Sequence, residues 1–389
     1  MVEAAPQARP GSRLAVLDGY RAVAILLVLG FHYGVRWAPP WSKDVYLPYH
    51  GLFAHLWPLK YGRSHACFFF ILSGFVILLT LERCSNLVDF WRKRLARLWP
   101  ALILCAGLTT LALALWGPAE WRKDPLSFLL SILMTDPDLF QKLVPNIDVD
   151  WIDGAYWTLA AEARFYIWVG LIFLLPRRVF LPAWLGLQLL SACLAPPAMD
   201  AVKALVPARM VLMPDYMPYF TLGICLFEIF RSGRWSGLPV YGALFGVLMI
   251  GLNAAGWSSF AFEDPKGRLV VNAFWIGMSV LFVLKSPLVR PLAWAPLAKL
   301  GEASYALFLL HEAAGISLMG MLDRLGVHPL VNLALVVAGM IGMSLLIHRF
   351  VEEPARKLIL GWTNGLVAQV SRRAPWLNYP RPLTQPRAV

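Results

Sequence analysis

The sequence predicts an all-α polytopic membrane protein with about ten transmembrane helices and both termini in the cytoplasm. Of its 389 residues, 59% are hydrophobic and 15% are charged, whereas about 25% of the residues in a soluble domain are charged. The apolar residues gather in segments that can cross a bilayer core of roughly 30 Å at about 1.5 Å per residue. Most of the 35 Lys and Arg residues fall between segments on the side of the termini, as expected for cytoplasmic loops.

The expected crossings are apolar runs bounded by basic residues, glycine or proline. The fourth, for example, ends before Pro176-Arg177-Arg178, the eighth before Lys285, and the tenth before His348-Arg349. The fifth has the weakest pattern, since Ala195-Pro196-Pro197 follows it closely. In chain order, the segments are residues 14–33, 66–81, 98–116, 156–175, 179–194, 216–230, 238–255, 269–284, 300–318 and 330–347.

We expect two parts, a membrane-embedded domain over residues 1–360 and a short basic cytoplasmic tail over residues 361–389. The lipid bilayer is therefore the first expected partner. The net charge of +12 comes without a basic stripe or a nucleic-acid-binding motif, which argues against nucleic acid as a partner. The five cysteines stand singly in apolar stretches without C-x-x-C spacing, so neither a metal site nor a disulfide framework is expected.

Ionisable residues inside apolar segments are candidate functional residues, because each costs at least about 2.5 kcal/mol at the centre of a membrane helix. Arg21 and His32 are eleven residues apart, which places them on one helix face about 16 Å apart along the axis. An imidazole with a pKa near 6.5 suits His32 as a general base for an attacking hydroxyl. The alternatives are an interfacial histidine and an arginine that extends to the lipid surface.

Two further segments carry polar residues on one face. Glu162 and Tyr166 lie four residues apart in the fourth segment, where a buried carboxylate needs a partner. Ser304 and His311 lie seven apart in the ninth, and His311 is a second candidate acid or base. The alternative for both clusters is polar contact between helices.

Charged residues at the expected inner surface form two more candidate sites. Arg94 and Arg97 are three residues apart in the loop FWRKRLARLWP, and paired guanidinium groups can hold phosphate. Positive-inside topology alone also explains such a loop. Glu352 stands beside Glu353 and Pro354 in HRFVEEPARK, where helix termination is the simpler interpretation.

Six runs, in order along nearly the whole chain, resemble signatures of the acyltransferase-3 family of integral membrane O-acyltransferases. This sequence departs from the family pattern at Thr158, where Ser is usual, at Ala163, where a second acid is frequent, at Phe308, where Tyr is usual, and at Glu353, where a base is common. The runs are LDGYRAVAILLVLGFHYG with Arg21 and His32, FFFILSGFVI with Ser73 and Gly74, RLARLWP with Arg94 and Arg97, YWTLAAEARFY with Glu162, GEASYALFLLH with His311, and VEEPAR with Glu352.

The resemblance implies transfer of an acyl group, commonly acetyl, from cytoplasmic acyl-CoA to a hydroxyl of a glycan or another cell-envelope acceptor. The location it implies is the inner membrane of a bacterium. Acyl-CoA is then a co-substrate, and no metal is involved. The residues that match the family's motifs divide into a catalytic group of His32, Arg21, Glu162 and His311 and a donor-binding group of Arg94, Arg97, Ser73 and Glu352.

The sequence leaves several alternatives open. The acyl group could be acetyl, succinyl or another acyl group. The transfer could be direct, or it could pass through an acyl-enzyme on His32 or a nearby serine. The acceptor is not specified, because aromatic residues of the expected outer loops suit both sugar rings and a membrane interface (Trp37, Trp41, Tyr46, Tyr49, Trp57, Trp151, Tyr156). A homo-oligomer is one option for the assembly. A transporter or flippase of a lipid-linked glycan or small metabolite is the alternative function, although no internal repeat supports it, and a membrane scaffold is the third.

Overall fold

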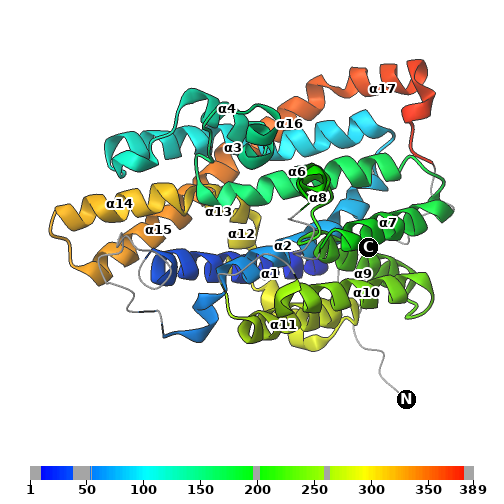
Figure 1. The fold of residues 1–389 in the computed structure, drawn as a ribbon, viewed down its shortest axis with the longest axis horizontal. Helices are drawn as coiled ribbons and strands as arrows, with labels where there is room; N and C mark the ends of the chain where they lie inside the picture. The colour runs from blue at the N-terminus through cyan, green and yellow to red at the C-terminus, as the bar shows by residue number, and fades with distance from the viewer. Residues whose placement is uncertain (1–9, 38–52, 54, 196–201, 258–262, 381–389) are drawn as a thin grey trace.

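The structure is a computed structural model that describes residues 10–37, 53, 55–195, 202–257 and 263–380. The chain is 81% helical, and no strand occurs in the described residues. Figure 1 shows most of the long helices running along one common direction, side by side. The all-α class expected from composition is therefore confirmed.

Seven helical stretches in the described part of the chain are long and apolar enough to cross a bilayer, and a bent pair makes a possible eighth. The bent pair is Ser304–Leu310 with Ala313–Arg324, at an angle of 59°. The seven stretches correspond to seven expected segments: Ala15–Arg36, Gly62–Leu81, Leu87–Leu115, Val206–Ser232, Leu238–Trp257, Pro265–Val283 and Pro329–Trp362.

The other two expected segments are helical but short. They form α6 (Trp157–Ile172) and α7 (Arg177–Cys193), of 16 and 17 residues, and α7 contains Pro182. At about 1.5 Å per residue, neither helix spans the roughly 30 Å of a bilayer core. A multi-pass helical protein is thus confirmed, whereas a count of about ten crossings is not.

The centre of the bundle contains α1 (Pro10–Phe31), α2 (Gly62–Leu81) and α9 (Met217–Ser232). A Cβ atom at Gly74 would lie 2.3 Å from the carbonyl oxygen of Phe220, and one at Gly223 would lie 2.1 Å from that of Ile71. Only glycine permits this close approach of two helix backbones. The glycine of the SGF run therefore holds α2 against α9, while the preceding serine, about 100° around the helix, points elsewhere.

The helix α3 (Leu87–Leu115) starts earlier than the expected residue 98, so the arginines predicted on a loop lie on a helix. Asn86 caps its start by accepting a hydrogen bond from the Asp89 backbone N–H at 2.7 Å. Asp89 pairs in turn with Arg92 and Lys93, three and four residues on, at 2.8 and 2.9 Å. These ion pairs carry the helix through the charged run that sequence analysis interpreted as a loop.

The part of the tail that the structure describes packs against the start of α3. The Asn86 side chain donates to Val367 O at 3.2 Å and to Ser371 Oγ at 2.7 Å on α17 (Asn364–Arg373). Tyr379 is buried, and its backbone N–H donates to Ser85 O at 3.0 Å. Residues 381–389 of the expected tail lie outside the described residues.

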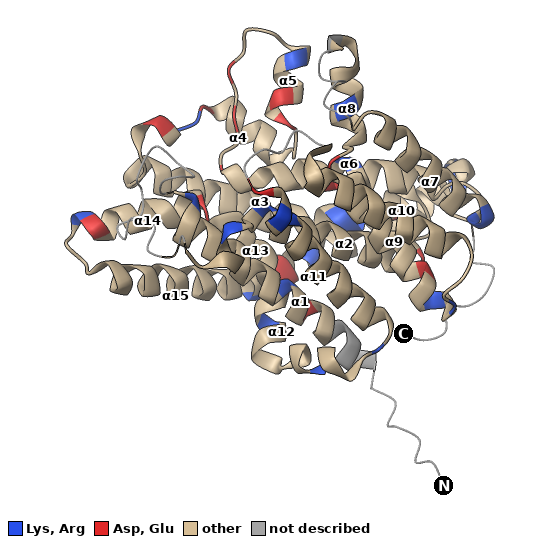
Figure 2. Cartoon of the chain, turned by 60° about the horizontal axis from the view of Figure 1, so that its bottom comes forward, with Lys and Arg blue, Asp and Glu red and all other residues tan. Residues whose placement is uncertain are grey.

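Charged residues are sparse on the helices, so most of the helical ribbon in Figure 2 is tan. Arg164, which lies inside an expected crossing, has partners that satisfy its charge. Its guanidinium group pairs with Asp136 at 2.9 Å and also donates to Met210 O. Its polar partners explain how an arginine is accommodated in this apolar segment.

Candidate active site

Two neighbouring cavities lie inside the bundle, and both are lined by Ala66 and Phe308. We call the first the arginine cavity, because Arg21, Arg94 and Arg97 line it. We call the second the histidine cavity, because His32 lines it. Counted with the open space at their mouths, they enclose about 820 and 1100 Å³.

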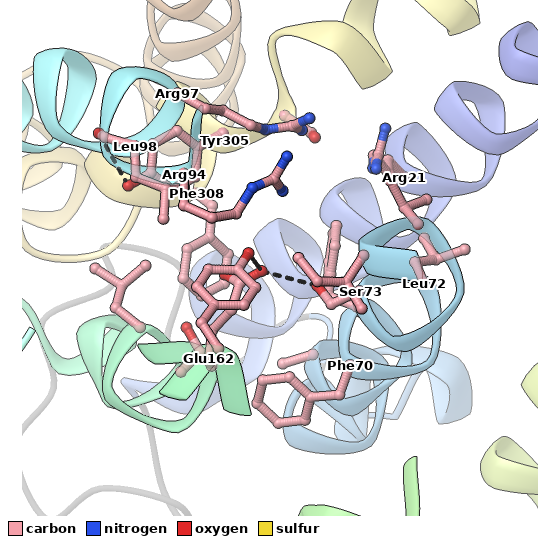
Figure 3. Close-up of a pocket in the computed structure, with 18 residues that line it drawn as sticks. Arg21, Phe70, Leu72, Ser73, Arg94, Arg97, Leu98, Glu162, Tyr305 and Phe308 are labelled. Carbon is pink, nitrogen blue, oxygen red and sulfur yellow. Dashed lines mark hydrogen bonds between the residues drawn. The ribbon is translucent and has the colours of Figure 1, made fainter. Parts of the chain in front are cut away.

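Figure 3 shows the guanidinium ends of Arg21, Arg94 and Arg97 directed into one space from α1 and α3. Arg94 is largely buried and donates to Thr80 Oγ1 at 3.0 Å, while its guanidinium carbon lies 5.8 Å from the centre of the Tyr166 ring. Arg21 pairs with Asp18 at 2.7 Å. The three arginines give this end of the cavity a positive charge that suits an anionic ligand such as a phosphate.

Glu162 also lines the arginine cavity, and its carboxylate has hydrogen-bond partners. Its Oε1 atom accepts a hydrogen bond from Ser73 Oγ at 2.8 Å and another from the Tyr166 hydroxyl (Figure 3). The carboxylate predicted to need a partner therefore has two, one on its own helix and one on α2. The structure thereby brings together five expected site residues: Arg21, Ser73, Arg94, Arg97 and Glu162.

The two basic residues that precede Arg94 in the run have another role. Arg92 and Lys93 bind Asp89, and Arg92 also donates to Asn364 Oδ1 at 2.8 Å. They hold α3 and the tail together and do not line the arginine cavity. Of the four basic side chains in the run FWRKRLARLWP, only Arg94 and Arg97 line the cavity.

His32 is the first residue of η1 (His32–Arg36), a π-helical turn that continues α1. Such turns occur frequently at functional sites. The His32 Nδ1 atom lies 3.0 Å from Glu312 Oε1. Because Nδ1 faces this carboxylate, Nε2 is the nitrogen left for a ligand.

Glu312 lies at the break between α13 (Ser304–Leu310) and α14 (Ala313–Arg324). Its side chain is buried and lines the histidine cavity. The second carboxylate oxygen, Oε2, has no hydrogen-bond partner among the described residues. A buried carboxylate oxygen without a donor is costly, so this atom is suited to accept a hydrogen bond from a bound ligand.

Asp153 fixes the position of this break. One of its oxygens accepts from the Ala313 backbone N–H at 2.8 Å and the other from that of Ala155 at 2.9 Å. Burial raises the pKa of the Asp153 carboxyl well above its usual range, and the nearby Glu312 carboxylate raises it further. Asp153 therefore binds a proton more readily than an ordinary aspartate does.

His311 is fully buried and lies behind His32. The two rings meet edge to face with their centres 4.8 Å apart, and His311 Nδ1 lies 2.8 Å from Phe308 O. His311 is absent from the lining of both cavities. His311 therefore contacts His32 without lining either cavity, and its expected part in catalysis stays a prediction.

Glu352 is set apart from the other expected site residues. It ends the π-helical turn η9 (His348–Glu352), and its Oε2 atom lies 2.9 Å from His348 Nδ1. It lines neither cavity. The donor-binding role expected of Glu352 stays a prediction.

The histidine cavity also contains residues that sequence analysis did not single out as site residues. Arg36, Arg63, Arg268 and Glu263 line it together with Glu312. The guanidinium of Arg63 lies over the Trp157 ring, 4.7 Å from its centre. Glu312 had a detectable signal, since an acid directly follows His311 within an apolar segment.

The aromatic residues expected to bind an acceptor are only partly placed. Of these residues, Trp37 lines the histidine cavity, and Trp41, Tyr46 and Tyr49 lie outside the described residues. The other three line neither cavity (Trp57, Trp151, Tyr156). A search of the described part of the chain for three or more His, Cys, Asp and Glu side chains that could hold a metal ion finds no such group.

The fold and the two cavities define a multi-pass helical membrane protein with a polar site inside its bundle. The model of the acyltransferase-3 family, described as an acyltransferase domain, matches residues 14–349. The chain belongs to this family, as its motifs indicated.

The similar proteins are acyltransferases. The acyltransferase MdmB of Streptomyces mycarofaciens is 26% identical over 362 residues, which are 83% of this chain and 85% of MdmB. The O-acetyl transferase of Shigella phage Sf6 is 29% identical over 160 residues, 39% of this chain and 44% of that protein. O-acetyltransferase OatA of Staphylococcus aureus strain NCTC 8325 / PS 47 is 23% identical over 378 residues, 88% of this chain and 57% of OatA. No solved structure matches.

Proposed function

We propose that this protein transfers an acyl group from cytoplasmic acyl-CoA to a hydroxyl group of a glycan or another cell-envelope acceptor, in the inner membrane of a bacterium. Acetyl is the acyl group we expect. The family and the O-acetyltransferase relatives support a membrane O-acyltransferase. The observation that carries the finer proposal is the His32–Glu312 pair in a cavity that adjoins one with three arginines.

The donor is proposed to enter the arginine cavity. Coenzyme A carries several phosphate charges, and Arg94 and Arg97 are placed to bind them by charge-assisted hydrogen bonds. Arg21 approaches from α1 on the opposite side of the same space (Figure 3). The thioester arm would then extend past Ser73 and Glu162 towards Ala66 and Phe308, where the two cavities meet.

The acceptor is proposed to bind in the histidine cavity. His32 Nε2 takes the proton of the acceptor hydroxyl while its oxygen attacks the thioester carbonyl carbon. The C–S bond breaks, the new ester forms, and the coenzyme A thiolate leaves and receives a proton from the imidazolium. Glu312 stabilises that imidazolium by its negative charge, since its Oε1 atom lies 3.0 Å from His32 Nδ1.

Release of free thiol from acetyl-CoA tests this proposal. Protein in nanodiscs is supplied with labelled acetyl-CoA and a glycan extract of bacterial membranes, and we expect His32→Ala to lower the rate about 10²- to 10⁴-fold. His348→Ala is the matched control, since His348 also contacts a glutamate but lies outside both cavities. It should retain wild-type rates.

Two results would overturn the proposal. Equal thiol release by wild type and His32→Ala would remove His32 from the chemistry. No release from several acyl-CoAs by folded wild-type protein would favour the transporter or flippase instead. Label that stays on the protein when acceptor is omitted would indicate an acyl-enzyme in place of direct transfer.

A further inference from the structure

One face of α2 forms a wall along both cavities. Arg63 and Ala66 line the histidine cavity, and Ala66, Phe69, Phe70 and Ser73 line the arginine cavity. Their spacing of three and four residues places them on one side of the helix. From Arg63 to Ser73 this wall is about 15 Å long, at about 1.5 Å per residue.

The two cavities share an apolar boundary. Ala66 of α2 and Phe308 of α13 are the lining residues common to both. The Phe69 ring packs on Phe308 with centres 6.2 Å apart, and Phe308 lies 5.5 Å from the His311 ring. We call Ala66, Phe69 and Phe308 the neck.

Polar side chains line both cavities on either side of the neck. Ser73 and Glu162 lie on the arginine side, and His32 and Glu312 lie on the histidine side. None of the three neck side chains carries a polar atom. Phe308 stands where a tyrosine is usual in the family's motif, so even the phenolic hydroxyl is missing at this point.

The acyl group must be at the neck during transfer if the proposed function holds. The phosphates are drawn to the arginines, whereas the attacking hydroxyl must contact His32 on the other side. The thioester carbonyl therefore has to reach the place where the cavities join. The methyl side chain of Ala66 leaves room on one wall, and the Phe308 ring occupies the opposite one.

We propose that the neck selects the acyl group, accepting a short, uncharged acyl such as acetyl and rejecting both longer chains and dicarboxylic groups such as succinyl. Each methylene that does not fit a rigid apolar site lowers the specificity constant roughly 10- to 200-fold. A carboxylate in the neck would lose its hydration without gaining a hydrogen-bond donor from the neck residues. This inference rests on the proposed function and decides between donors that the sequence left open.

A series of donors tests the neck: acetyl-, propionyl-, butyryl-, octanoyl- and succinyl-CoA, each followed by thiol release and acyl transfer in nanodiscs. For wild type we expect kcat/KM to fall at least tenfold from acetyl to butyryl, and at least tenfold from acetyl to succinyl. Phe308→Ala should raise the butyryl-to-acetyl ratio at least tenfold. Ala66→Val should lower the propionyl-to-acetyl ratio, because it narrows the neck from the opposite wall.

Phe308→Tyr is the matched control, since it keeps the ring and should preserve the butyryl-to-acetyl ratio within about threefold. If Phe308→Ala does not fold, as judged by gel filtration and thermal unfolding, Phe308→Leu replaces it with the same expected direction. Two results would overturn the selection by the neck. One is a wild-type kcat/KM that is about equal for acetyl-, butyryl- and succinyl-CoA. The other is that these kcat/KM ratios stay at their wild-type values in folded Phe308→Leu and Ala66→Val proteins. Failure of the proposed function is distinct, because then no donor releases thiol even with wild-type protein.

Discussion

At the scale of single residues, the contact between His32 and Glu312 gives the most direct chemical prediction. We expect Glu312→Gln to lower kcat by about 10- to 10³-fold, because an amide cannot stabilise the imidazolium formed when His32 takes a proton. The loss should be smaller than for His32→Ala, since the base itself remains. The measurement is the rate of acyl transfer at saturating donor, and Glu302→Gln, an exposed change at the end of α12 (Ala295–Glu302), serves as control. Full activity of Glu312→Gln would exclude Glu312 from this role.

The arginines of α3 give a second prediction, about donor binding. Arg97→Ala removes a charged donor from the arginine cavity, which typically costs about 1.5–3 kcal/mol. We therefore expect the KM for acetyl-CoA to rise about 10- to 100-fold. Arg92→Ala, five residues earlier, should leave this KM unchanged, because Arg92 binds Asp89 and Asn364. Equal effects of the two substitutions on KM would contradict phosphate binding by the cavity arginines.

At the scale of helices, the contact between α2 and α9 depends on the absence of a side chain. Gly74→Val should prevent stable folding, because its Cβ would lie 2.3 Å from a backbone oxygen that cannot move independently of α9. Gly107→Ala on α3 is the matched control, since no atom lies within 4 Å of its added Cβ. Yield and thermal unfolding in detergent measure the difference. A Gly74→Val protein with wild-type unfolding temperature would show that the helices separate readily.

The broken ninth segment shows how an interrupted helix creates a site. A continuous helix through His311 and Glu312 would satisfy their backbone groups internally. At the break, Asp153 instead accepts from the Ala313 N–H, and Glu312 turns towards His32. The 59° bend therefore places an acid and a base from distant segments in contact.

At the scale of the whole molecule, the charge distribution predicts one orientation in the membrane. Both termini should lie in the cytoplasm, with the long connection between α3 and α6 on the opposite side. In a Cys193→Ala background, which removes the exposed cysteine, Lys142→Cys should react with an impermeant maleimide in intact cells. Arg372→Cys should react only after the cells are permeabilised. The reverse pattern would invert the orientation and with it the side from which acyl-CoA enters.

Features that depend on residues close together in the chain could be predicted from the sequence. Hydropathy identified the apolar helices, because burial in lipid is decided segment by segment. Helical periodicity placed Glu162 beside Tyr166, and the hydrogen bond between them confirms that placement. The order of the motifs identified the family that the comparison with residues 14–349 confirms.

The contacts between distant segments became known only from the packing of the helices. The pairing of Glu162 with Ser73 and of His32 with Glu312 joins helices that are far apart in the chain, and such contacts follow from packing between helices. Packing also gave two arginines of one charged run different surroundings, since Arg97 lines the arginine cavity and Arg92 binds Asn364. Glu352 belongs to a family motif, yet it pairs with His348 outside both cavities. Local sequence pattern specifies which face of a helix is polar. The partner of that face depends on how all the helices pack together.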